Sequence, residues 1–146
     1  MPFKPLMHLS IFAALAACDL FGPTPSLSHA AAMFWCGPTD GPATAIVLAQ
    51  EPVQSVPAPY PRVSVMIWQS VTDIAGHIFT VTSGAAAGAV YFPSPDKIES
   101  AISGTIMIRS VDAAKTVRGA VSLQFPSRIV ETPFTAPWIN NGMLCG

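Results

Sequence analysis

The chain has 146 residues, which fits one domain because single domains commonly have roughly 100 to 150 residues. Hydrophobic residues make up 51% and charged residues only 10%, so disorder driven by high charge is excluded. The 7 basic and 8 acidic residues leave no excess of positive charge for a phosphate backbone, and no nucleic acid is expected as a partner.

Residues 1–17 have the features of a secretory signal peptide. The N-terminal amine and Lys4 precede an apolar stretch from Leu6 to Ala17, which only His8 and Ser10 interrupt. This stretch has about 12 residues, too few for a membrane-spanning helix, which needs roughly 20. We therefore expect a cleaved leader.

The end of the leader, Leu15-Ala16-Ala17-Cys18, resembles the lipobox of bacterial lipoproteins. In that motif a branched apolar residue and two small residues precede the cysteine that is lipidated and becomes the mature N-terminus. The resemblance implies lipidation of Cys18 and anchoring to the cell membrane, on its periplasmic or extracellular face. Residues 18–33, which contain Gly, Pro and Ser, are then expected to be a flexible tether.

Ordinary secretion is the alternative to lipidation. Ser28-His29-Ala30 is a small-x-small sequence of the kind that signal peptidase cuts. Cleavage after Ala30 would remove Cys18 with the leader and release a soluble protein.

The cysteine count also bears on the fold. Three cysteines in an exported chain leave one without a partner, and lipidation of Cys18 accounts for it. Cys36 and Cys145 should then form a disulfide in an oxidising compartment. A reactive or metal-bound pair is the alternative, but the chain has no CxxC motif and only His77 within the domain, so we expect no metal and no cofactor.

Residues 34–146 are predicted to form one all-β domain, a small sandwich or partly open barrel of about seven antiparallel strands. The expected strands are, in chain order, residues 43–49, 62–69, 76–82, 89–92, 104–111, 117–125 and 129–138. The alternation is clearest in 117–125, where Val117, Val121, Leu123 and Phe125 share one face. The stretch Ser94–Ala101 is the only helix that we expect.

A proline-rich stretch and three tryptophans have both a structural and a functional interpretation. Pro52–Pro61 is either a stiff loop between strands, which we favour, or a polyproline ligand for another protein. Trp35, Trp68 and Trp138 either pack in the core, which we favour, or form a platform on which a ligand stacks.

The sequence contains no recognisable catalytic motif. Asp73 and His77 could approach each other, and a serine could complete a triad, but no G-x-S-x-G is present. Phosphate-binding loops, dinucleotide fingerprints and H-E-x-x-H are also absent from the sequence. We therefore expect no enzyme and assign no catalytic residue.

Both ends of the chain resemble small exported bacterial lipoproteins with a disulfide-closed β-domain. The resemblance rests on the lipobox and on the pattern Phe134-x-Ala136-x-Trp138 followed by Cys145-Gly146. It implies a location and no particular activity. The expected function is that of a non-enzymatic accessory protein of the envelope, with the membrane, an envelope protein or the cell wall as partner. The alternatives are a ligand-binding or enzyme-inhibitor module, which would engage its target through Pro52–Pro61, and a small hydrolase.

Overall fold

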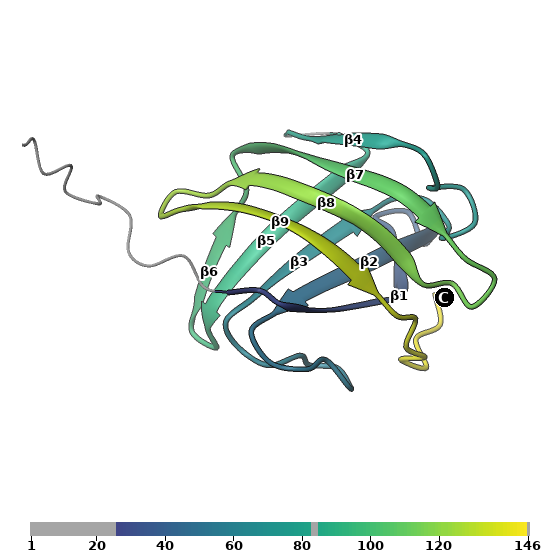
Figure 1. Ribbon diagram of the computed structural model, residues 1–146, viewed down its shortest axis with the longest axis horizontal. Coiled ribbons are helices and arrows are strands. Elements are labelled where there is room, and N and C mark those ends of the chain that lie inside the picture. The colour runs from purple at the N-terminus through teal and green to yellow at the C-terminus, as the bar shows by residue number, and fades with distance from the viewer. Residues whose placement is uncertain (1–25, 83–84, 146) are drawn as a thin grey trace, which may run out of the picture.

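The computed structural model describes residues 26–82 and 85–145, which form one strongly curved sheet (Figure 1). The strands of these residues are β1 (His29–Cys36), β2 (Pro42–Ala49), β3 (Arg62–Ile67), β4 (Ile78–Val81), β5 (Ala87–Ser94), β6 (Lys97–Ser100), β7 (Ser103–Val111), β8 (Val117–Gln124) and β9 (Ile129–Ala136). The order in the sheet is β1-β2-β3-β5-β4-β7-β8-β9, and β6 pairs with β5 beside this path. The described part of the chain holds no helix, and hence none long and apolar enough to cross a membrane.

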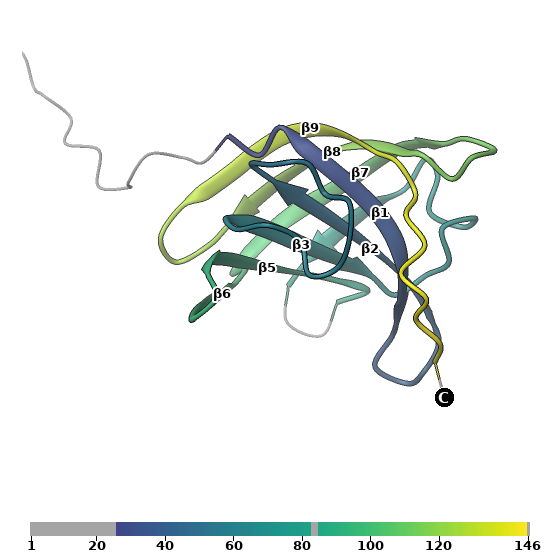
Figure 2. The same ribbon diagram turned by 90° about the horizontal axis from the view of Figure 1, so that it is seen from below.

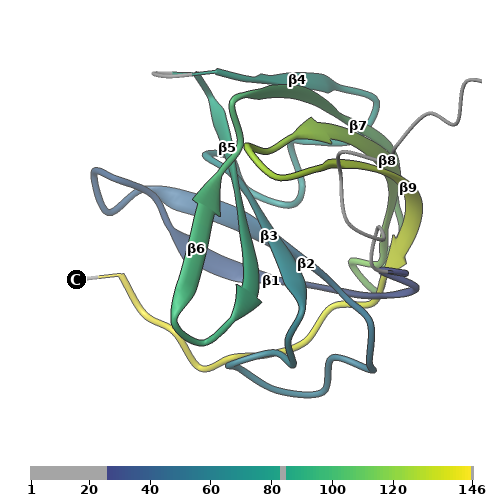
Figure 3. The same ribbon diagram turned by 90° about the vertical axis from the view of Figure 1, so that its left-hand side faces the viewer.

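The sheet curls until its two ends meet, so it is a nearly closed barrel (Figure 3). Where the ends meet, the Ala32 amide of β1 donates to the carbonyl of Pro137 at 2.8 Å, and the Ile139 amide donates to the carbonyl of Ala32 at 2.8 Å. These bonds form a parallel bridge between Ala32 and Trp138, just beyond the end of β9. The all-β prediction is confirmed, in its barrel form.

The barrel has more strands than the seven expected, and β1 is the first addition. It pairs with β2 along its whole length, from His29 opposite Ala49 to Cys36 opposite Pro42. The sheet thus begins before residue 34, inside the stretch 18–33 where we expected a tether. The strand contains a run of three alanines, a residue depleted in strands, and pairing with β2 overrides that preference.

The second additional strand is β6, where the prediction of a helix over Ser94–Ala101 is wrong. Pro95 and Asp96 turn the chain between β5 and β6, and Lys97 then pairs with Ser94. The Glu99 carboxylate accepts hydrogen bonds from the amide and hydroxyl of Ser127, the latter at 2.7 Å. These tertiary contacts outweigh the local helix preference of Lys and Glu.

The interior of the barrel is filled with large apolar side chains, so it forms the main core. Strict alternation along β3 and β8 directs every second residue inward, as the sequence predicts for β8. The largest fully buried side chains are those of Tyr91, Phe125, Met33, Ile46, Leu48, Ile67, Ile74, Ile106, Ile108, Leu123, Val63 and Val65. All but Met33 belong to the main core. The rings of Tyr91 and Phe125 lie with their centroids 5.7 Å apart.

A smaller apolar cluster lies on the outer face of β1 and β2. Every residue of β2 from Ala43 to Ala49 is buried, because Ile46 and Leu48 face the barrel interior while Ala45 and Val47 face outward into this cluster. Its buried members are Ala31, Met33, Ala45, Val47 and Ala58. We call this group the outer cluster. Because of it, this part of the sheet is covered on both faces.

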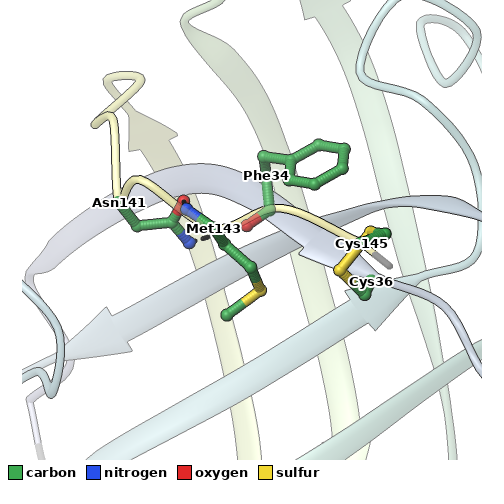
Figure 4. Close-up of a disulfide and its surroundings, with 5 residues drawn as sticks. All are labelled: Phe34, Cys36, Asn141, Met143 and Cys145. Atoms are coloured by element: carbon green, nitrogen blue, oxygen red, sulfur yellow. Dashed lines mark hydrogen bonds between the residues drawn. A yellow bond between two sulfur atoms is a disulfide. The ribbon is translucent and has the colours of Figure 1, made fainter. Parts of the chain in front are cut away.

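A disulfide between Cys36 and Cys145 fastens the last described residue to the end of β1 (Figure 4). The two Cα atoms are 5.6 Å apart, within the usual range for a disulfide, and the pair is 109 residues apart in sequence. The Asn141 side-chain amide supports the same contact by donating to the carbonyl of Phe34 at 2.7 Å. The predicted pairing of these cysteines is confirmed.

Removing this disulfide should destabilise the fold. In the chain-entropy model, a closed loop of roughly 100 residues contributes about 4 to 5 kcal/mol. We expect the double variant Cys36→Ser/Cys145→Ser to lose stability of that order in urea unfolding. Dithiothreitol should lower the midpoint of the wild type towards that of the variant and leave the variant unchanged. A wild-type midpoint that does not respond to reduction would contradict this assignment.

Gly119 in β8 marks a position where two strands approach too closely for any side chain. A β-carbon there would clash with the Met107 carbonyl oxygen and lie 2.9 Å from Cζ of Phe134. We expect Gly119→Ala to lower the free energy of unfolding by about 1 to 3 kcal/mol, as overpacking does. Gly88→Ala is the matched control in β5, because its new carbon would meet only Cζ2 of Trp68, at an ordinary 3.9 Å. Equal unfolding midpoints for the two variants would refute the steric account.

Candidate functional site

The loop between β2 and β3, residues 50–61, folds back over the outer face of the sheet (Figure 2). Ala58 is 5% exposed and belongs to the outer cluster, and Val53 packs half-buried against the same cluster. Four prolines restrict the backbone of this stretch. Pro52–Pro61 is therefore a loop between strands, as predicted, and it roofs one patch of the sheet.

A cavity of about 170 Å³ lies beneath this loop. Its lining residues come from β1, β2, β3, β5 and the loop itself: Met33, Trp35, Ala45, Val47, Arg62, Ser64, Met66, Phe92, Val56, Pro57 and Ala58. Nearly all of them are apolar. The lining reaches the protein surface at Val56, which is 46% exposed, and at Pro57. A molecule from solvent can therefore enter the cavity.

The strand register explains why a hollow forms here. Met33 of β1 lies directly opposite Ala45 of β2, and Ala45 lies directly opposite Met66 of β3. Directly paired residues project from the same face of a sheet, so the short Ala45 side chain stands between two long ones. The low floor at Ala45 and the loop above it enclose the space.

Arg62, the first residue of β3, is the one charged residue among the described residues that line this cavity. Its guanidinium carbon lies 4.2 Å from the ring centroid of Tyr60 and 4.7 Å from that of Phe92. Its Nη1 donates to the carbonyl of Ala58, which ties the guanidinium to the roof. Cation–π contacts of this kind hold a guanidinium in place without neutralising its charge.

No carboxylate neutralises Arg62 within the described residues. In residues 26–82 and 85–145 the ion pair that forms is Arg118 with Asp112, at 3.1 Å. A guanidinium has five N–H donors, and here a protein oxygen accepts from one nitrogen only. A residue of the cavity lining thus carries a positive charge, and the other guanidinium nitrogens have no protein acceptor among the described residues.

The Asp73–His77 pair does not form the arrangement that a catalytic triad needs. His77 Nδ1 contacts the backbone carbonyl of Asp73 at 3.0 Å, and the Asp73 carboxylate accepts from Thr72 Oγ1 at 3.2 Å instead. All three residues are exposed, in the turn before β4. The carboxylate therefore does not orient the imidazole, and neither residue lines the cavity.

The three tryptophans have separate places. Trp138 packs against the main core, and the ammonium of Lys115 lies 5.1 Å from its ring centroid. Trp68 is half-buried beside Gly37 and Gly88. Trp35 packs against the outer cluster and lines the cavity, so it is both a packing residue and a wall of the site.

A second hollow, of about 460 Å³, lies where the first described residues meet β7, β8 and β9. Arg109 and Arg118 line it together with Leu27, Pro133 and Phe134. Arg118 is already paired with Asp112, and the walls mix polar and apolar groups. This hollow is less suited to hold an apolar group than the cavity beneath the loop.

Among the residues that the structure describes, two titratable groups have displaced pKa values, and neither lines the cavity. Burial raises the pKa of the Tyr91 hydroxyl, while nearby Arg128 opposes that shift. The pKa of the exposed Asp112 carboxyl is lowered, mainly by a hydrogen bond from the Thr116 backbone amide and also by one from the Arg118 side chain. Both groups serve contacts within the fold: Tyr91 fills the barrel, and Asp112 holds the turn between β7 and β8.

Only part of this site could be predicted from the sequence. Cys18, the predicted lipidation site, lies outside the described residues, and Cys36 and Cys145 lie at the barrel closure rather than in the cavity. The cavity itself was not predicted. The feature of the sequence that could have indicated it is a strand, β2, whose outward positions are apolar and which is followed directly by a proline-rich loop.

No three His, Cys, Asp or Glu side chains lie close enough to hold a metal ion in the ranges that the structure describes. Comparisons of the chain with protein-family models, with curated proteins and with solved structures found no match. The candidate site is therefore defined by its own geometry: an apolar cavity under a proline-rich loop, with one cation held at its wall by two rings.

Proposed function

We propose that the chain is an exported, lipid-anchored and non-enzymatic binding domain of the cell envelope. Its site is the cavity beneath the loop 50–61, which receives an apolar group of a ligand. The observation that carries this proposal is the apolar lining of a cavity that reaches the surface. Concave, mostly apolar sites with a few fixed polar groups are typical of small-molecule binding.

The lining favours binding over catalysis. Arg62 and Ser64 are the polar members of the lining, and no histidine or carboxylate is among them. A serine nucleophile needs a base within hydrogen-bond reach, and Ser64 has none among the residues that line the cavity. Of the alternatives that the sequence left open, ligand binding is therefore preferred to hydrolysis.

Two observations support export and anchoring through Cys18. The disulfide of Cys36 and Cys145 is of a kind that persists in oxidising compartments. Cleavage after Ala30 would cut through β1, remove Leu27 from the core and leave a charged amine on Ala31, which is 1% exposed. Cleavage before Cys18 leaves all of β1 intact. Through the lipid on Cys18 the membrane would be the first partner, and an envelope protein or the cell wall lies within reach of the tethered domain.

The mature N-terminus tests the anchoring. Mass spectrometry of protein purified from membranes should find a diacyl or triacyl group on Cys18, and Cys18→Ala should move the protein out of the membrane fraction. An unmodified terminus at Ala31 would contradict lipidation and also the role of Leu27 in the core.

Binding at the cavity can be followed on its methionines. In protein labelled with carbon-13 at its methionine methyl groups, 3-phenylpropanol should shift the signals of Met33 and Met66, which line the cavity. The signal of Met107, 40% exposed on the outer face of β7, serves as the internal reference and should not shift.

Substitution of the cavity floor gives a second check. Ala45→Leu should fill the space and weaken binding by at least about tenfold, since burying extra methylenes there excludes the ligand's own apolar group. Ala120→Leu, the same change at a half-buried position of β8 that does not line the cavity, is the matched control and should bind as the wild type does. Equal weakening in both variants would reject the cavity as the site.

A further inference from the structure

We propose that the cavity selects a small monocarboxylate, whose apolar group fills the cavity and whose carboxylate binds the Arg62 guanidinium. This inference rests on the proposed function, because it names the ligand class for the same site. It follows from three features of the cavity: its unpaired cation, its size and the absence of acidic groups in its lining.

The first feature is the position of the Arg62 side chain at the cavity, where its guanidinium can bind the carboxylate of a ligand. Arg62 lines the cavity, and Tyr60 and Phe92 hold its guanidinium through their rings at 4.2 and 4.7 Å. One nitrogen donates to the Ala58 carbonyl, and no carboxylate of the described residues forms an ion pair with the others. Because the planar fork of donors matches the two oxygens of a carboxylate, arginine is well suited to bind one.

The size of the cavity limits the apolar part of the ligand. At about 170 Å³ it is close to an apolar cavity of about 150 Å³ that accepts benzene. One aromatic ring or a short branched alkyl group fits this volume, whereas a long acyl chain would have to leave most of its length in solvent. The pairing of Met33, Ala45 and Met66 across three strands closes the floor.

The charge of the lining sets the sign and number of charges on the ligand. An amine would face Arg62 without an acidic partner among the lining residues, so cations are disfavoured. One guanidinium matches one carboxylate, and a dianionic phosphate would leave charge unpaired beside apolar walls, which is costly. The matching ligand therefore carries one negative charge next to one compact apolar group.

Three probes of one shape test the proposal: 3-phenylpropionate, 3-phenylpropanol and 3-phenylpropylamine, titrated into the labelled protein at the same ionic strength. We expect the acid to bind at least about tenfold more tightly than the alcohol, because its carboxylate gains a charge-assisted hydrogen bond from Arg62. The amine should bind most weakly. All bound probes should shift the methyl signals of Met33 and Met66. Acid binding should weaken as salt is added, while alcohol binding should not.

Arg62→Gln should bring the acid and the alcohol to the same affinity while the alcohol still shifts Met33 and Met66, which shows that the cavity has formed. Arg109→Gln, in the second hollow, is the matched control and should keep the preference for the acid. If Arg62→Gln does not fold, the salt dependence of the wild type decides the question.

The outcomes separate the two proposals. An acid that binds no more tightly than the alcohol, or a preference that survives Arg62→Gln or is lost in Arg109→Gln, overturns the carboxylate inference and leaves the binding function standing. If none of the three probes shifts Met33 or Met66, the binding function itself fails.

Discussion

The attachment of the chain's end to β1 is the constraint on which the rest of this structure depends. Backbone hydrogen bonds join Ala32 to Pro137 and Ile139. The Asn141 side chain donates to the Phe34 carbonyl, and the disulfide links Cys36 to Cys145 (Figure 4). These contacts close the curved sheet and occupy the middle of the outer edge of β1. Unpaired strand edges invite pairing with other chains. Because β1 also carries Met33 and Trp35, the same attachment positions one wall of the cavity.

The second organising feature is that β2 is buried on both faces. An antiparallel sheet commonly has one face on the core and one in water, and β8 follows that rule. The outward side chains of β2, Ala45 and Val47, are instead covered by the loop 50–61 and by neighbours in the outer cluster. They are small, so coverage by a proline-stiffened loop is incomplete and a hollow remains. The cavity is thus a product of packing a rigid loop against a sheet face with short side chains.

This origin of the cavity supports the binding function proposed above. Its groups were brought together by the register of three strands and by one loop, and they include no titratable pair that could pass a proton. What the arrangement supplies is apolar surface and one fixed positive charge. The two aromatic rings beside Arg62 limit its motion, so a ligand would find the charge in place and would lose less entropy on binding.

Elements whose causes are local could be predicted from the sequence alone, and most of the fold class with them. Alternation in 117–125 directs side chains to two faces, so β8 could be predicted directly. The pairing of Cys36 with Cys145 was predicted from the cysteine count and from the oxidising compartment that the expected export would imply. β1 and β6, in contrast, form through tertiary contacts. An alanine-rich segment becomes a strand only because β2 lies beside it, and Lys97–Ser100 becomes one because β5 and Ser127 hold it extended.

The candidate site also has features that are visible in the sequence and others that depend on tertiary contacts. The proline-rich loop and the apolar outer positions of β2 are visible in the sequence, but the cavity exists only once the register sets Met33 and Met66 on either side of Ala45. Arg62 is one of seven basic residues in the sequence, and nothing local distinguishes it. Its role depends on distances to Tyr60 and Phe92, and Phe92 comes from a strand 30 residues further along the chain, as the pairing of Arg62 with Phe92 shows. Contacts between segments so far apart are decided by packing, which no local pattern encodes.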